Sequence, residues 1–282
     1  SRSSAASDVY KRQHYEMLAR SGWQQMDTLS MPWTSYIPHR PTPKQTAFLL
    51  LDIPEALYGG AAGGGKSDAL LMAALQYVND PQYSALLLRR SYADLALPGA
   101  LMDRAKEWLL PTEARWREAS KTWTFPSGAT LSFGYLEHTG DEYRYQSTEF
   151  QFIAFDELTQ FEENQYRYMF SRLRRPADSM VPLRMRAASN PGGVGHEWVR
   201  GRFIDGDVGN DSRIFISARL PDNPYLDQQA YVNSLNELDP ITRRQLLEGD
   251  WTARQAGNLF QREWFPVVED VPVFINRSVR YW

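Results

Sequence analysis

Gly60-Ala61-Ala62-Gly63-Gly64-Gly65-Lys66-Ser67 is the stretch of sequence that decides the fold. It fits the pattern G-x-x-x-x-G-K-[ST], with a short apolar stretch before it and helix-forming residues after it. Glycines let backbone N–H groups turn inward around a phosphate, and the N-terminus of the following helix adds its positive dipole. The stretch therefore predicts a phosphate-binding loop. We expect Lys66 to neutralise the β- and γ-phosphates and the Ser67 hydroxyl to ligate Mg²⁺.

A second motif, Phe152-Ile153-Ala154-Phe155-Asp156-Glu157, is an apolar strand that ends in two carboxylates. Such an ending is also common in ordinary strands, but here it follows a phosphate loop, and ligands of open α/β sheets bind at the carboxyl ends of the strands. We expect Asp156 to hold Mg²⁺ and Glu157 to orient and deprotonate the attacking water. A glutamate at this position favours hydrolysis over phosphoryl transfer. The guanine signature N-K-x-D is absent, so ATP is the expected nucleotide.

The rest of the chain alternates between strand and helix patterns. We expect helices at 67–78 and 98–110 and a polar helical stretch that ends near residue 173, and strands at 56–58, 84–88, 122–125, 129–135, 150–155, 183–189 and 213–217. Strand–helix–strand order implies crossover connections. The sequence therefore predicts an α/β fold with a mostly parallel central sheet.

Composition limits the classes of function. The 282 residues include no cysteine, which excludes disulfides, thiolate metal sites and cysteine nucleophiles. No apolar run approaches the roughly 18 residues of a membrane span. Overall charge is nearly balanced, at 31 basic and 34 acidic residues. One segment is basic, because residues 165–202 hold eight arginines, at 167, 172, 174, 175, 184, 186, 200 and 202, against Asp178 and Glu197. This segment is either a solvated face or a surface for phosphates.

Together, the loop GGAAGGGKS, the strand FIAFDELT and Ser189-Asn190-Pro191-Gly192-Gly193 resemble the large terminase subunit of tailed bacteriophages. The resemblance implies a P-loop NTPase fold of the ASCE type with a small lid subdomain. It further implies a Mg²⁺-dependent ATPase motor that translocates double-stranded DNA into a procapsid. The implied partners are DNA, the portal protein, the small terminase subunit and further copies in a ring, with no membrane. The implied location is the cytoplasm of the infected host, without secretion.

The resemblance also assigns roles to individual residues. Gln45 matches an adenine-contacting position, although it could instead cap the helix that begins near Pro43. Ser189 and Asn190 match a coupling motif that senses the γ-phosphate, although Asn-Pro is also a common turn. Arg144 matches an arginine finger acting in trans, with a plain surface arginine as the alternative and Arg89, Arg90 and Arg174 as competitors. The ATP-binding set is then Gln45, Gly60, Ala61, Ala62, Gly63, Gly64, Gly65, Lys66 and Ser67.

The expected organisation has five parts. Residues 1–13 read as a non-native tail, 14–32 as a helical arm, 33–220 as the ATPase core and 221–265 as the lid. Residues 266–282 read as a linker and the start of an RNase H-like nuclease domain that the chain lacks, so we expect no DNA cleavage. Two rival functions stay open: another DNA-directed ATPase of the helicase or recombinase type, and a non-catalytic, nucleotide-gated assembly module. A small-molecule kinase is disfavoured by Glu157.

Overall fold

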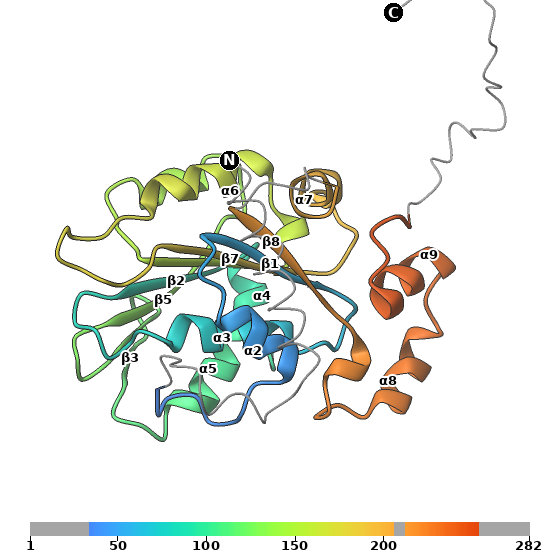
Figure 1. Ribbon diagram of the computed structural model, residues 1–282, viewed down its shortest axis with the longest axis horizontal. Helices are drawn as coiled ribbons and strands as arrows, with labels where there is room; N and C mark the ends of the chain where they lie inside the picture. Colours follow the sequence, from blue (N-terminus) through green and yellow to red (C-terminus); the bar gives the residue numbers. More distant parts are fainter. Residues whose placement is uncertain (1–33, 206–211, 254–282) are drawn as a thin grey trace, which may run out of the picture.

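The computed structural model describes residues 34–205 and 212–253. Their centre is an eight-stranded sheet in the order β3-β4-β5-β2-β6-β7-β1-β8 (Figure 1). Its strands are β1 (Glu55–Gly60), β2 (Ser84–Arg89), β3 (Arg115–Arg117), β4 (Thr122–Thr124), β5 (Thr130–Tyr135), β6 (Phe152–Asp156), β7 (Arg184–Ser189) and β8 (Arg213–Ala218). The β5-β2-β6-β7-β1-β8 part is parallel, whereas β3, β4 and β5 pair antiparallel. The expected α/β class and mostly parallel sheet are confirmed.

Helices cover both faces of the sheet, as Figure 1 shows. One face carries α2 (Pro43–Leu49), α3 (Lys66–Leu75), α4 (Tyr92–Ala96) and α5 (Leu101–Leu109), and the other carries α6 (Glu163–Met169) and α7 (His196–Phe203). Side chains of a strand alternate between these layers: Leu87 joins the core on the α3 side, and Leu86 and Leu88 join the core on the α6 side. Burial on both faces explains why the central strands are continuously apolar.

Residues 221–253, which we call the lid segment, lie to one side of the sheet (Figure 1). The segment begins within the 3-10 turn η5 (Leu220–Asp222). They form α8 (Gln228–Leu235), α9 (Pro240–Arg243) and one π-helical turn, η6 (Arg244–Glu248). Asp227 and Asp239 cap the first two helices, because each carboxylate accepts a hydrogen bond from backbone N–H groups of the first turn. The segment contacts the sheet where η6 meets β1.

Some helix boundaries differ from the sequence expectation, and some elements were not expected. The helix expected at 67–78 ends at Leu75, where the Gln76 side chain donates to the Leu49 carbonyl and accepts from Arg184. The helix expected at 98–110 begins only at Leu101, because Gly99 is left-handed at φ 75° and Ala100 is extended. The strand β3 and the helices α4 and α7 were not expected.

Parts of the expected organisation fall outside the described residues. These are the tail at 1–13, the arm at 14–32, the end of the lid at 254–265 and the linker at 266–282. Within the described residues, no helix has both the length and the apolar character needed to cross a bilayer.

Candidate nucleotide-binding site

The loop at 60–67 joins β1 to α3 at the carboxyl edge of the sheet, as its sequence predicts. Three of its glycines, Gly60, Gly63 and Gly65, have φ values of 123°, 74° and 72°. L-residues with a side chain rarely adopt this backbone, so the turn depends on glycine. Lys66 opens α3 and is 7% exposed. Its Nζ donates to the Ala61 carbonyl at 2.7 Å, so the ammonium group lies folded over the loop.

Asp156 and Glu157 lie at the end of β6, separated from the loop strand β1 only by β7. Asp156 is 1% exposed, and its Oδ2 pairs with the Arg89 guanidinium from the end of β2. Its other oxygen, Oδ1, is buried without a hydrogen-bond partner. Glu157 has a left-handed backbone at φ 55°, which turns the chain out of the strand. Such strain in a residue other than glycine is typical of functional sites.

The charges of these residues influence one another. Burial raises the pKa of Asp156, and Arg89 opposes that shift. Burial and the neighbouring Asp156 raise the pKa of Glu157, and Lys66 opposes the shift. Burial also lowers the pKa of Lys66, while Glu157 and Asp156 favour its charged form. Mutual electrostatic effects of this kind require short separations in a poorly solvated site. The structure therefore brings together the loop lysine and both carboxylates.

The residues fit a divalent cation. Asp156 presents a buried oxygen that has no partner in the protein, and carboxylate oxygen is a preferred ligand of Mg²⁺. The described residues hold no group of three or more His, Asp or Glu side chains that could bind a metal alone.

Ser189 and Asn190, at the end of β7, lie beside the carboxylates. The buried Ser189 hydroxyl is 2.9 Å from Oγ1 of Thr159, whose backbone N–H also donates to it at 3.1 Å. A hydrogen bond from the Asn190 backbone supports the Glu157 carboxylate. Oδ1 of Asn190 is buried without a partner. Asn190 therefore contacts the expected base, whereas Ser189 bonds to Thr159 in the turn that follows this base.

Family comparison agrees with this geometry. The family described as "Terminase large subunit, T4likevirus-type, N-terminal" matches residues 57–267, well over half of the chain. The chain belongs to this terminase large subunit family. No curated protein matches the chain.

Solved terminases share the fold. The large terminase of a thermophilic bacteriophage matches with a TM-score of 0.61 and 14% identity, over 76% of this chain and 54% of that chain. The HK97 bacteriophage large terminase matches with a TM-score of 0.55 and 11% identity, over 76% of this chain and 51% of that chain. The ATPase domain of the Thermus phage P74-26 large terminase matches with a TM-score of 0.53 and 13% identity, over 79% of this chain and 100% of that chain. The fold is therefore that of P-loop NTPases, and the chain spans about half the length of the first two of these terminases.

Gln45 occupies a structural position in this terminase domain. Its Oε1 accepts from the Thr42 backbone at 2.8 Å, which completes a capping box at the start of α2. Its Nε2 donates to the Gly65 carbonyl at 2.8 Å, and the side chain is 2% exposed. The capping alternative is therefore present in the structure, together with a direct bond to the phosphate loop. An adenine contact of Gln45 stays a prediction.

The candidate arginine fingers occupy different places. Arg89 pairs with Asp156, and Arg90 donates to the Leu136 carbonyl and the Gln165 amide. Arg144 pairs with Asp141 and lies over the Tyr135 ring, at the carboxyl end of β5. Its side chain is 48% exposed at the edge that carries the site. Arg174, by contrast, bonds through its backbone to Phe150, ahead of β6, which places it at the opposite edge.

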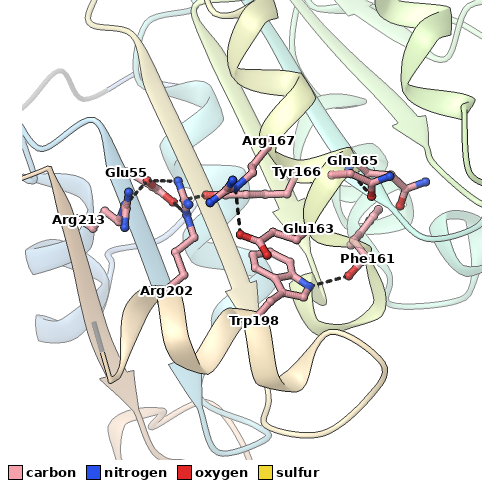
Figure 2. Close-up of polar contacts among 10 residues, drawn as sticks. Glu55, Phe161, Glu163, Gln165, Tyr166, Arg167, Trp198, Arg202 and Arg213 are labelled. Carbon is pink, nitrogen blue, oxygen red and sulfur yellow. Dashed lines mark hydrogen bonds and ion pairs between the residues drawn. The ribbon is translucent and has the colours of Figure 1, made fainter. Parts of the chain in front are cut away.

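The basic run at 165–202 is mostly an internal feature of the terminase fold. Arg172, Arg184 and Arg186 are buried, and Arg175 donates to the Val181 carbonyl. The remaining four pair with carboxylates: Arg167 with Glu163, Arg174 with Glu149, Arg200 with Asp205 and Arg202 with Glu55. Figure 2 shows Arg202 and Arg213 converging on Glu55, which also accepts from the Tyr166 hydroxyl at 2.9 Å. Arg202 therefore joins α7 to β1, and the other arginines of the run bond to nearby carboxylates, amides or carbonyl groups.

The lid segment lies on the phosphate loop, a contact that the sequence did not reveal. The Leu246 carbonyl in η6 accepts from the Ala62 N–H at 2.6 Å, and Asn223 Nδ2 donates to the Gly63 carbonyl at 2.7 Å. A cavity of about 590 Å³ lies between the lid and the sheet edge. Its lining includes Glu157, Asn190, Gly192, His196, Gln245 and Leu246. The cavity is thus bounded on one side by the candidate base and coupling residues and on the other by the lid.

Proposed function

We propose that this chain is the ATP-hydrolysing motor domain of a viral terminase, which translocates double-stranded DNA into a procapsid. One observation carries the proposal: Lys66, at the start of α3 after β1, lies at the same edge of the sheet as Asp156 and Glu157 at the end of β6, with only β7 between the two strands. A triphosphate needs a cation at its terminal phosphates, a metal ligand and a base for water, and these residues supply all three. Two further structures of the thermophilic-phage terminase, in complex with ATP-gamma-S and with ADP, have the same fold.

In the proposed reaction, backbone N–H groups of the loop at 60–67 and the Lys66 ammonium bind the phosphates. Ser67 and Asp156 would hold Mg²⁺, which when bound would neutralise charge on the phosphate oxygens. Glu157 accepts a proton from the attacking water, and its raised pKa suits this role because a general base works best when its pKa lies nearer neutrality. Asn190 lies against Glu157, where loss of the γ-phosphate changes its surroundings.

The larger assembly belongs to the same proposal. DNA, the portal protein, the small terminase subunit and a ring of identical chains are the partners, in the cytoplasm of the infected host. The lid segment rests on the phosphate loop, and this contact supports a mechanism in which hydrolysis moves the lid and the motion passes to DNA.

Glu157→Gln is the direct test. The amide cannot accept the proton, so we expect ATP binding within about threefold of the wild type and turnover reduced by about 100-fold or more. Phosphate release measures turnover and equilibrium titration measures binding. Glu163→Gln is the matched control, because Glu163 pairs with Arg167 on α6 and should leave turnover unchanged.

Undiminished turnover in Glu157→Gln would refute the assigned base. No phosphate release from the wild type, alone or with duplex DNA, would favour the non-catalytic assembly module. Stimulation by single strands together with unwinding would favour a helicase. Stimulation by duplex DNA without unwinding is the result expected of a packaging motor.

A further inference from the structure

His196 begins α7 and stands between the coupling residues and the lid segment. Its Nδ1 lies 2.8 Å from the Gly192 backbone nitrogen, within residues 190–193. Its Nε2 lies 3.2 Å from the Trp251 carbonyl oxygen of the lid segment. The imidazole also stacks on the Trp251 ring, with centroids 5.5 Å apart and an interplanar angle of 27°. One side chain therefore contacts both moving parts of the proposed motor.

The two contacts fix the protonation of the ring. The Gly192 N–H can only donate, so Nδ1 must accept and carries no proton. The Trp251 carbonyl can only accept, so Nε2 must carry the proton. The neutral ring satisfies both bonds at once. Because His196 is 7% exposed and Trp251 5% exposed, water offers little replacement for either bond.

On one side, the link reaches the catalytic carboxylate. Gly192 follows Asn190 by two residues, and a hydrogen bond from the Asn190 backbone reaches Glu157. The Gly195 N–H donates to the Thr159 carbonyl at 2.7 Å, which ties the start of α7 to the turn after Glu157. A shift at Asn190 therefore reaches the imidazole through a short backbone path.

On the other side, the link reaches the phosphate loop. Trp251 follows η6 closely, and η6 accepts a hydrogen bond from Ala62 through Leu246. Gln245 of the same turn donates to the Ala253 carbonyl at 2.8 Å, which ties η6 to the segment around Trp251. The contacts form a closed circuit from Glu157 through His196 and the lid to the phosphate loop.

We propose that His196 is a positioning residue that transmits the state of residues 190–193 to the lid segment through its two ring nitrogens. This rests on the proposed ATPase function, but it concerns lid position rather than chemistry. Each half of the link can be removed separately. Asparagine can keep an acceptor near Nδ1 and is too short to reach Trp251, whereas glutamine can keep a donor near Nε2 and offers no acceptor to Gly192.

The test measures lid position directly. Because the chain has no cysteine, Glu107→Cys on α5 and Glu237→Cys in the lid, both at exposed positions, allow two spin labels to be attached uniquely. Interspin distances are measured on the 282-residue chain without nucleotide, with ADP and with ATP-gamma-S. We expect a nucleotide-dependent shift in the wild type that is lost in His196→Asn and in His196→Gln. In both variants kcat should fall about tenfold while KM stays within about threefold.

Trp198→Phe is the matched control. Trp198 lies on the same helix and donates to the Phe161 carbonyl at 2.9 Å, a bond within the core that does not involve the lid (Figure 2). Trp198→Phe should lose thermal stability and keep the shift, which separates transmission from general loosening of α7. Glu157→Gln should also keep the shift, because it binds nucleotide without hydrolysis. A wild type without any shift, a His196→Asn or His196→Gln chain that shifts normally, or a Trp198→Phe chain that loses the shift would overturn the inference.

Discussion

Glu157 combines two unfavourable features in one residue. Its backbone is left-handed at φ 55°, which a residue with a side chain adopts at a cost of about 1 kcal/mol or more. Its carboxylate is placed where burial and Asp156 both disfavour the charge and raise its pKa. Active sites commonly hold such features, because catalysis requires a group that the rest of the fold keeps out of its most stable state.

We therefore expect Glu157→Gln to stabilise the chain at neutral pH. The folded-state pKa of Glu157 lies above its unfolded value of 4.5. The free energy of unfolding of the chain therefore falls as the pH rises from 4.5 through the folded-state pKa, because the folded chain disfavours the ionised carboxylate. Glutamine removes this loss. The melting temperature of Glu157→Gln should therefore exceed that of the wild type at pH 8. The difference should shrink as the pH falls towards 4.5, because the raised pKa favours the neutral Glu157 carboxyl in the folded chain.

Asp239→Asn provides a control of opposite sign. Hydrogen bonds from Thr242 lower the pKa of Asp239, which caps α9, so its charge supports the fold. Asp239→Asn should therefore melt below the wild type at pH 8 and approach it only as the pH falls through the lowered pKa of Asp239. A lower melting temperature for Glu157→Gln at pH 8 would show that its charge is stabilised by Lys66 more than it is opposed by burial.

At the scale of elements, the backbones of lid and loop lie close together at Gly249, directly after η6. Its φ is 67°, and a Cβ there would lie 2.6 Å from the Ala61 backbone nitrogen and 2.7 Å from the Gly60 carbonyl carbon. Backbone atoms cannot give way as a flexible side chain can. The turn after η6 therefore fits against the phosphate loop only because this residue is glycine.

Gly249→Ala should consequently move the lid off the loop and weaken the Ala62–Leu246 hydrogen bond. We expect faster hydrogen exchange of the Ala62 amide, lower turnover, and a stability loss of about 1–2 kcal/mol. Gly99→Ala is the matched control, since Gly99 has φ 75° and nothing lies within 4 Å of its added Cβ. Gly99→Ala should show a similar strain and unchanged turnover. Equal exchange at Ala62 in the wild type and Gly249→Ala would mean that the lid turn does not constrain the loop.

The same elements show which parts the sequence could predict. The strands β1 and β6 could be predicted because each is a short apolar run that ends at glycine or a charged residue, at Gly59 and Asp156. The phosphate loop could be predicted because its glycines are required at fixed spacing. Residues with long-range partners gave no local signal. Arg202 reads as part of a basic surface, yet it pairs with Glu55, which lies 147 positions earlier in the chain. His196 has no motif of its own, because its role depends on Gly192 and Trp251 together.

At the scale of the whole molecule, the two edges of the sheet carry different residues. The carboxyl edge holds the candidate nucleotide site and, at β5, the exposed Arg144. The opposite edge holds Arg174. The side chain of Arg174 is 47% exposed and that of Arg144 is 48% exposed, and each arginine pairs with a single carboxylate. Arg144 follows β5, which is two strands away from the strand that carries Asp156. An exposed arginine on the edge that carries the site is suited to reach the site of an adjacent chain in a ring.

Mixing two inactive variants tests this assignment. Arg144→Ala keeps its own Glu157 and lacks the finger, whereas Glu157→Gln keeps the finger and lacks the base. We expect each alone to hydrolyse ATP at a small fraction of the wild-type rate, since a finger contributes roughly 10³–10⁵ in rate. In a ring mixed at equal ratio, about a quarter of the interfaces join an intact base to an intact finger, so activity should return to up to about a quarter of the wild-type value. Arg174→Ala should keep wild-type turnover alone. Absence of recovery at every ratio would refute the assignment of Arg144 as a finger that acts between subunits, because such a finger must complement Glu157→Gln. An equal loss of turnover in Arg174→Ala would also refute it, because the assignment requires the arginine to lie at the edge of the sheet that carries the site.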